Sequence, residues 1–275
     1  MDKIIGLGKA GCNIARGFEK YPQYDVYKID HRHSDEMNYY VYPKYEDPEL
    51  YDAYNPDLEY FFKHLSGEAL FITCGGSKIS SASLRVLQQA RDKAEINVLY
   101  IKPDVSELSG TELLNENAVF NVFQEYARSG VFKSLIIVEN KTIETVLGGL
   151  PVFGYYERIN ETLVSTIHML NVFDNTDPVF NTYSDLHDPS RIMTIGTVNP
   201  KNSEEYSFYN MEEIREKKYY FAIPENHLKS DQNLLKNIRE NIDKECDTTF
   251  GIYSTNYEDN HVYFLSRTTK IQKNI

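Results

Sequence analysis

The sequence predicts an α/β protein, with a Rossmann-like parallel sheet, a long central helix and a smaller α+β region after it. Short apolar runs alternate with longer amphipathic stretches through the first two-thirds of the chain, which is the pattern of a parallel sheet covered by helices. A glycine-rich turn directly follows the first of these runs. The chain has 275 residues, enough for one large domain or two modest ones with a substantial core.

Composition excludes several classes of protein. The 29 basic and 41 acidic residues give a formal charge of −12, without the uniform basic field of non-specific nucleic-acid binding, so we expect no direct nucleic-acid partner. No apolar run approaches the roughly 20 residues of a membrane span, so we expect no membrane partner. The three cysteines are far apart and suit neither a disulfide framework nor a zinc site. These features predict a cytoplasmic protein.

The first half of the chain reads as alternating strands and helices. Apolar runs predict five strands, at residues 3–7, 25–30, 69–73, 97–101 and 134–138. Amphipathic stretches between them predict helices near residues 11–18, 58–65, 81–90 and 115–128. The segment 33–56 is rich in tyrosine, acids and proline without sustained periodicity, and we expect a long surface excursion there.

The second half begins with the long helix. Ile159, Leu163, Ile167 and Leu170 recur near helical spacing and predict a helix over residues 155–173. Beyond it we expect strands at 192–198 and 219–223, a helix near 228–246, and a closing hairpin formed by strands 249–254 and 261–266.

The opening turn carries the first functional signal. Gly6, Gly8 and Gly11 form a G-x-G-x-x-G pattern between a strand and a helix. Such a turn presents backbone N–H groups at the positive end of a helix and lets a phosphate approach closely. Asp30 ends the second strand, about where a dinucleotide-binding fold places its ribose-binding acid. An NAD(P)-dependent oxidoreductase of Rossmann type is therefore one hypothesis.

The pattern continues to Asn13, and the octapeptide G-x-G-x-x-G-x-N resembles the first nucleotide loop of the tubulin/FtsZ family. In that family the closing asparagine reaches the guanine. The residues that we assign to nucleotide binding in this part of the chain are Gly6, Gly8, Lys9, Ala10, Gly11, Cys12, Asn13 and Asp30.

Two further segments resemble the family in order along the chain. Gly75 and Gly76, followed by Ser77 and Lys78, are similar to its glycine-rich signature loop after a strand, although only the two glycines match cleanly. Backbone N–H groups, a hydroxyl and a cation there suit phosphate oxygens. Glu107 falls on the acid that binds the ribose hydroxyls in the family.

The long helix carries the base-side resemblance. Tyr156 and Asn160 fall on the family positions that stack on guanine and hydrogen-bond its edge. An aromatic face stacks on any base, whereas an amide both donates and accepts. We therefore expect Asn13 and Asn160 to read guanine together.

A polar loop after the helix resembles the family loop that enters the neighbouring subunit's nucleotide site. A gap-free count from Tyr156 puts the second acid of that loop at Asp185, while Thr182 replaces the first. Asp188 lies one turn further and could substitute for it. An acid positions water only within hydrogen-bond reach, so the loss of one should slow hydrolysis more than binding.

The resemblance implies a GTP-binding protein that forms head-to-tail cytoskeletal filaments, with GTP or GDP and Mg²⁺ as ligands and itself as partner. It divides the chain into a nucleotide domain (1–153), a central helix (154–173) and a C-terminal domain (174–275). We expect no protein metal site, because His31 and His33 have no well-spaced third ligand. We expect no long adaptor-binding tail after residue 270, and the compact form resembles family members of phages or plasmids. A third hypothesis is a relative that binds nucleotide without polymerising.

Overall fold

The computed structural model describes residues 1–184, 190–199 and 202–273. Its N-terminal half holds six parallel strands in the order β3-β2-β1-β4-β5-β6. Their bounds are β1 (Lys3–Leu7), β2 (Asp25–Asp30), β3 (Tyr39–Val41), β4 (Glu68–Cys74), β5 (Glu95–Lys102) and β6 (Ser134–Glu139). The central strands are buried on both faces, as parallel strands covered by helices must be.

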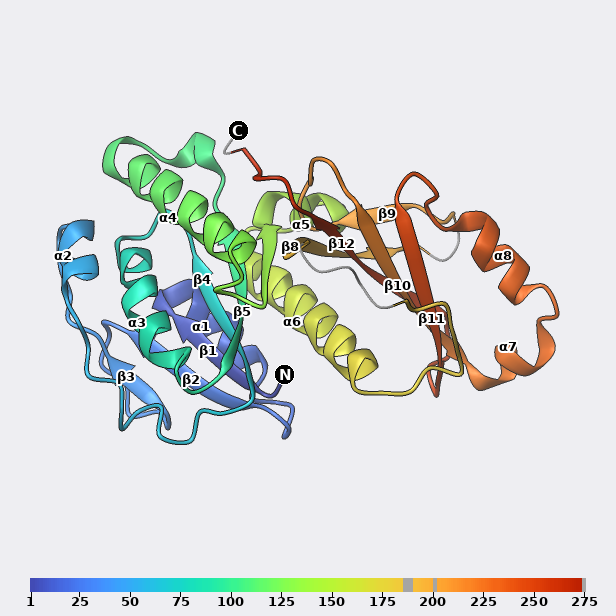
Figure 1. Ribbon diagram of the computed structural model, residues 1–275, viewed down its shortest axis with the longest axis horizontal. Helices are drawn as coiled ribbons and strands as arrows, with labels where there is room; N and C mark the ends of the chain where they lie inside the picture. Colours follow the sequence, from blue (N-terminus) through green and yellow to red (C-terminus); the bar gives the residue numbers. More distant parts are fainter. Residues whose placement is uncertain (185–189, 200–201, 274–275) are drawn as a thin grey trace.

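Helices cover both faces of this sheet (Figure 1). One face packs against α1 (Gly8–Gly17), α5 (Asn140–Val146) and α6 (Tyr155–Asp174), which share one apolar cluster. The other face packs against α2 (Pro48–Ala53), α3 (Ser83–Ala90) and α4 (Gly110–Arg128). Two short 3-10 turns, η1 (Lys78–Ala82) and η2 (Val105–Glu107), follow β4 and β5. Both lie at the carboxyl edge of the sheet, where the site residues are predicted.

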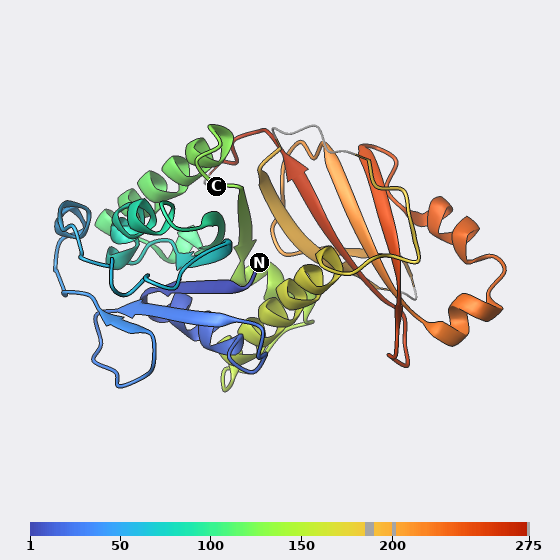
Figure 2. The same ribbon diagram turned by 60° about the horizontal axis from the view of Figure 1, so that its bottom comes forward.

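The C-terminal half extends the same sheet rather than forming a separate one. Its strands are β7 (Phe180–Asn181), β8 (Ile192–Val198), β9 (Glu205–Ser207), β10 (Glu216–Pro224), β11 (Asp247–Thr255) and β12 (His261–Thr268). Beyond β6 the order is β8-β12-β10-β11-β7, with β9 on β8. The connection is narrow, because β6 and β8 pair only at Leu135 with Ile192 and Ile136 with Met193. Figure 2 shows the two halves on either side of this junction. The predicted boundaries at 153 and 173 stay a prediction.

The predicted closing hairpin is wrong. β11 and β12 follow each other along the chain, but β10 lies between them and pairs with both. The pairing of β10 with β11 is parallel, from Glu216 with Asp247 to Pro224 with Thr255. The connection between β11 and β12 has the polar composition of a hairpin turn, but it joins two strands that are not neighbours in the sheet.

Two predicted helices also differ from the structure. Residues 58–65 form turns rather than a helix, although Leu58, Phe62 and Leu65 are buried at helical spacing. The Leu58 N–H donates to the Gln89 side chain of α3, and the Phe62 N–H donates to the Leu58 carbonyl oxygen at 2.8 Å, so the segment forms isolated turns. The predicted helix over 228–246 is two short ones, α7 (Glu225–Ser230) and α8 (Leu234–Asn241).

Helix α6 crosses the sheet from its carboxyl edge to its amino edge. At its start the Tyr155 hydroxyl donates to Glu144 of α5, the helix that begins where β6 ends. Near its end the Asn171 amide donates to the carbonyl oxygen of Met1, just before β1. The helix has 20 residues, which corresponds to a length of about 30 Å. Its two ends therefore lie at opposite edges of the N-terminal sheet.

Candidate functional site

The candidate site lies at the carboxyl edge of the sheet, between β1 and β4. In the order β3-β2-β1-β4-β5-β6 the chain leaves β1 toward one side and β4 toward the other, and such a switch point is where open α/β sheets bind ligands. The two predicted phosphate turns meet there. A Cβ atom on Gly8 would lie 2.8 Å from the Ile79 side chain, which follows Gly75 and Gly76.

The glycines of the first turn are required by backbone packing. A Cβ on Gly6 would lie 2.6 Å from the Gly11 carbonyl oxygen, and one on Gly11 would lie 2.4 Å from the Ile72 carbonyl oxygen on β4. Gly8 has φ +72°, a conformation that favours glycine. The three glycines bring the start of α1 against β1 and β4 and keep side chains away from that helix end.

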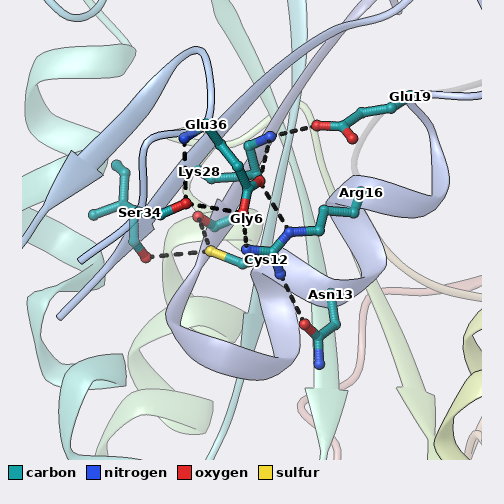
Figure 3. A network of polar contacts seen from close by, with 9 residues as sticks. Gly6, Cys12, Asn13, Arg16, Glu19, Lys28, Ser34 and Glu36 are labelled. Atoms are coloured by element: carbon teal, nitrogen blue, oxygen red, sulfur yellow. Dashed lines mark hydrogen bonds and ion pairs between the residues drawn. The ribbon is translucent and has the colours of Figure 1, made fainter. Parts of the chain in front are cut away.

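The side chains that follow the turn have different surroundings (Figure 3). Cys12 is buried, and its Sγ lies 3.4 Å from the Gly6 oxygen and 3.5 Å from the Ile29 oxygen. Burial raises the pKa of the Cys12 thiol to about 12, so it is neutral at pH 7. Asn13 is exposed, as are Lys9 and Ala10. Cys12 can thus offer a ligand its backbone, whereas Asn13 also offers its side chain.

Arg16 fixes the orientation of Asn13. Its Nη1 donates to Asn13 Oδ1 at 2.9 Å, and its Nε and Nη2 hold the Glu36 carboxylate at 3.0 and 2.9 Å. Hydrogen bonds from Arg16 and Lys28 lower the pKa of Glu36 to about 2. Lys28 is buried and also pairs with Glu19. The Asn13 amide therefore keeps its NH₂ group for a ligand.

Asp30 ends β2 and is buried in the structure. It is 3% exposed, and its Oδ1 accepts the backbone N–H of His31 at 2.9 Å. The carboxylate on which the dinucleotide hypothesis depends is thus covered and already hydrogen-bonded.

The second glycine turn is supported by α4. Asn115 donates from its Nδ2 to the Ser77 carbonyl oxygen at 2.9 Å and to Ser80 Oγ at 3.1 Å. Its Oδ1 accepts from Ser81 Oγ at 2.5 Å. Ser77 and Lys78 are exposed above this support. Lys78 pairs with Glu46 at 3.2 Å, an exposed ion pair that costs little to exchange for another anion.

A group of buried polar residues beneath this turn was missed by sequence reasoning. Glu116 of α4 is fully buried, and its Oε2 accepts from the Tyr100 hydroxyl at 2.6 Å. A Cβ on Gly75 would lie 1.6 Å from that oxygen. Burial raises the pKa of Glu116 to about 7, although Tyr100 and the charge of Lys102 oppose the rise. The available signal was an acid on the apolar stripe that includes Phe120, since both side chains are buried on one face of α4.

The predicted ribose and base residues lie at the start of α6 and in the turn after β5. Glu107 is exposed in η2. Burial raises the pKa of Tyr155 to about 12, with contributions from Glu144 and from the charge of Glu107, which places Glu107 near the start of α6. Tyr156 is 63% exposed, and its ring contacts Tyr155 edge-on. One face of Tyr156 is therefore available for stacking.

Asn13 and Asn160 occupy corresponding positions on two neighbouring helices. A Cβ on Gly17 would lie 2.8 Å from Val164, and beyond these residues Tyr21 stacks on His168 at 3.7 Å. Contacts between the two segments therefore recur every four residues along both of them. One helical turn before Gly17 and Val164 lie Asn13 and Asn160.

The predicted catalytic residues Asp185 and Asp188 lie outside the described residues. The chain that leads to them is attached to β11, because the Phe250 N–H donates to Thr182 Oγ1 at 3.0 Å and the Thr182 N–H donates to the Phe250 carbonyl oxygen at 2.9 Å. In the described part of the chain, no group of three or more His, Cys, Asp or Glu side chains could hold a metal ion.

A comparison with solved structures shows which known fold the chain has. The chain matches an empty FtsZ dimer from M. jannaschii with a TM-score of 0.71 and 11% identity, over 98% of this chain and 88% of that one. It matches a GTPγS-form protofilament of TubZ from Bacillus thuringiensis serovar israelensis with a TM-score of 0.71 and 17% identity, over 97% of this chain and 88% of that one. The chain has the tubulin/FtsZ fold. A TubZ described as a type III plasmid segregation protein matches this fold with a TM-score of 0.69 and 18% identity, over 98% of this chain and 88% of that one.

The fold match confirms the resemblance predicted from the sequence motifs, including the α/β class and the long central helix. No protein-family model matches the chain, and no curated protein sequence matches it. Among the described residues, no helix of this tubulin/FtsZ fold combines the length and apolar character needed to cross a bilayer.

Proposed function

We propose that the protein binds GTP and GDP at the carboxyl edge of the sheet. The observation that carries this proposal is the meeting of two glycine turns at the switch point of a tubulin/FtsZ fold, with an exposed tyrosine and an amide on the adjoining helix. Glycines at Gly6, Gly8 and Gly11 leave the start of α1 open to a phosphate, and a helix N-terminus favours an anion.

The two turns divide the phosphate contacts. The N–H groups of Lys9 and Ala10 at the start of α1 would hold one part of the polyphosphate. Ser77 and Lys78 of the second turn are exposed beside them and would hold another. Mg²⁺ bound with the nucleotide would neutralise phosphate charge and prefers oxygen ligands. Glu107 would accept hydrogen bonds from the ribose hydroxyls.

The base would lie against Tyr156 and between two asparagines. Stacking on Tyr156 would supply affinity without selecting the base. Because Arg16 occupies Asn13 Oδ1, Asn13 would donate to the base, and Asn160 would complete the recognition of guanine.

We also propose head-to-tail self-association. The FtsZ and TubZ structures of similar fold are described as a dimer and a protofilament. The chain leaves α6 at the amino edge, about 30 Å from the candidate site at the helix start. Asp185 would then serve the site of the next copy rather than its own. A contact between two different surfaces propagates into an open filament.

Hydrolysis would be slow in this arrangement. The Thr182 side chain is used to bind β11, and it stands where the family places the first acid. Asp185 would therefore position water with Asp188 as its only acidic neighbour in that loop. We place this activity in the cytoplasm, in agreement with the three free cysteines Cys12, Cys74 and Cys246. The similarity to a TubZ described as a plasmid segregation protein supports a role in moving DNA.

Ligand choice tests the proposal. GTP and GDP should raise the midpoint of thermal unfolding, whereas NAD⁺ and NADH should leave it unchanged. Stabilisation by NAD(H) alone would overturn the proposal in favour of the oxidoreductase. Pelleting with GTP and Mg²⁺ tests the assembly: a protein that binds GTP and stays in the supernatant is a non-polymerising relative.

Asp185→Ala tests whether this acid positions the attacking water in the nucleotide site of the next copy. The variant should bind GTP as tightly as the wild type, hydrolyse it more slowly and form longer-lived filaments, because the acid acts only on the attacking water. An unchanged rate of hydrolysis would remove Asp185 from the mechanism.

A further inference from the structure

A fully buried carboxyl group lies directly beneath the second glycine turn. Glu116 Oε2 accepts a hydrogen bond from the Tyr100 hydroxyl at 2.6 Å. Glu116 Oε1 has no hydrogen-bond partner among the described residues. Gly75 fits only because it lacks a side chain, since its Cβ would lie 1.6 Å from Oε2 and 2.1 Å from the Tyr100 oxygen. The turn therefore rests on this carboxyl group.

The charged and titratable groups around Glu116 come from β4 and β5. Tyr100 and Lys102 lie on β5, and Cys74 ends β4. Lys102 is 2% exposed, and its Nζ lies 5.9 Å from the centre of the Phe120 ring. Burial and the charge of Glu116 raise the pKa of both Cys74 and Tyr100, so these two groups stay neutral. Lys102 is therefore the cation that faces the carboxyl group.

We propose that Glu116 is a positioning residue for the phosphate turn, and that binding of a nucleotide's phosphates on this turn is coupled to proton uptake by its carboxyl group. This inference rests on the proposed nucleotide function. The turn packs directly on the carboxyl group, because a Cβ on Gly75 would lie 1.6 Å from Glu116 Oε2. A phosphate adds negative charge above a poorly solvated carboxylate, which disfavours the ionised form.

The direction of the coupling follows from the charges. In the free protein the pKa of Glu116 is about 7, and a bound phosphate raises it further. The protonated protein therefore binds the nucleotide more tightly than the ionised protein. Affinity falls as pH rises above about 7, and each unit by which the phosphate raises the pKa corresponds to a tenfold difference in affinity.

Calorimetry of the full-length wild type measures the coupling without any substitution. GDP is titrated at pH 7.5 in two buffers with different ionisation enthalpies, and the difference in binding heat gives the protons taken up. Glu116→Gln keeps the shape of the side chain but removes its charge. Glu125→Gln, an exposed acid on the same helix that pairs with Arg128 at 3.5 Å, is the matched control.

We expect the wild type and Glu125→Gln to take up more protons than Glu116→Gln, since titration of the GDP phosphates is common to all three. Between pH 6 and 8 the Kd of the wild type should rise about tenfold more than that of Glu116→Gln. Tyr100→Phe provides a second variant. It removes a hydrogen bond that lowers the pKa of Glu116, so the pH dependence should move to higher pH.

The outcomes separate this inference from the proposed function. Equal proton uptake by the wild type and Glu116→Gln, with GDP binding intact, overturns the coupling and leaves the proposed function in place. An unshifted pH profile in folded Tyr100→Phe also contradicts it. Wild-type protein that binds no guanine nucleotide at any pH overturns both proposals.

Discussion

The two glycine turns of the candidate site are built differently. In the first, the missing side chains of Gly6 and Gly11 make room for backbone carbonyl groups of the turn and of β4. In the second, the missing side chain of Gly75 makes room for the side-chain atoms of Glu116 and Tyr100. The backbone of a buried sheet cannot move without breaking its ladder, whereas side chains can change rotamer or protonation state. The first turn is thus a fixed element and the second an adjustable one.

Gly11→Ala should have the largest effect on stability. Its new Cβ would lie 2.4 Å from the Ile72 carbonyl oxygen, so either α1 or β4 has to shift. We expect a loss of roughly 3 kcal/mol or more in the free energy of unfolding, measured by urea denaturation. Gly17→Ala on the same helix is the control, because the three atoms nearest to its Cβ all belong to the Val164 side chain and none to the backbone. Similar losses in the two variants would show that the first turn is not fixed by its backbone.

The pH dependence of stability should distinguish the second turn. The pKa of Glu116 is raised from 4.5 to about 7 by folding, so the native protein keeps a proton that the unfolded chain has lost. Its contribution is full below pH 4.5 and decreases as pH rises to about 7. Relative to Glu116→Gln, the wild type should lose about 3 kcal/mol of unfolding free energy between pH 4.5 and 8. A constant difference across this range would mean that the carboxyl group is not held in a poorly solvated site.

Gly75→Ala should be destabilising mainly through Glu116. In a double-mutant cycle with Glu116→Ala, the Gly75 substitution should cost about 2 kcal/mol less when the glutamate is absent, because the closer of the two colliding side chains is then gone and only the Tyr100 hydroxyl has to move. Chemical denaturation of the four proteins measures this coupling. Additive losses would mean that the Glu116 side chain does not limit the space at Gly75.

On the base side, at the start of α6, the effect should be smaller. Tyr156→Ala should weaken GDP binding by about 1 kcal/mol through lost stacking, whereas Tyr60→Ala, another exposed tyrosine, should not change it.

Asn160→Ala should reduce the preference for guanine over adenine nucleotides. Fluorescence titration with both bases measures these effects, and equal discrimination in the Asn160 variant would contradict its role in base recognition.

The sequence predicted the elements whose pattern is local. The strands Lys3–Leu7, Asp25–Asp30 and Ile192–Val198 have the predicted bounds, and α6 differs from its prediction by a single residue at its end. The closing hairpin failed because its outcome depends on β10, which inserts between two strands that are consecutive in the chain. The partner of a strand is decided by packing across the whole sheet.

The candidate site was predictable where glycines and polar residues follow strands. Its buried part was missed, because Glu116 is distant in sequence from Gly75, and an acid on the apolar stripe of α4 does not by itself say which turn it contacts. The hydrogen bond to Asp30 was equally hidden, since its donor is the backbone N–H of His31. Sequence motifs therefore identified which segments meet, but not which side chains remain available there.

The junction between β6 and β8 has a mechanical consequence. Because the sheet is continuous, the two halves cannot rotate about a flexible linker without breaking the ladder at Leu135 and Ile136. Each hydrogen bond lost there would cost about 1 kcal/mol, and α6 packs alongside on the same face. A tensile load applied at one end of the molecule would thus be transmitted along the strands, and bending would concentrate at this narrow junction.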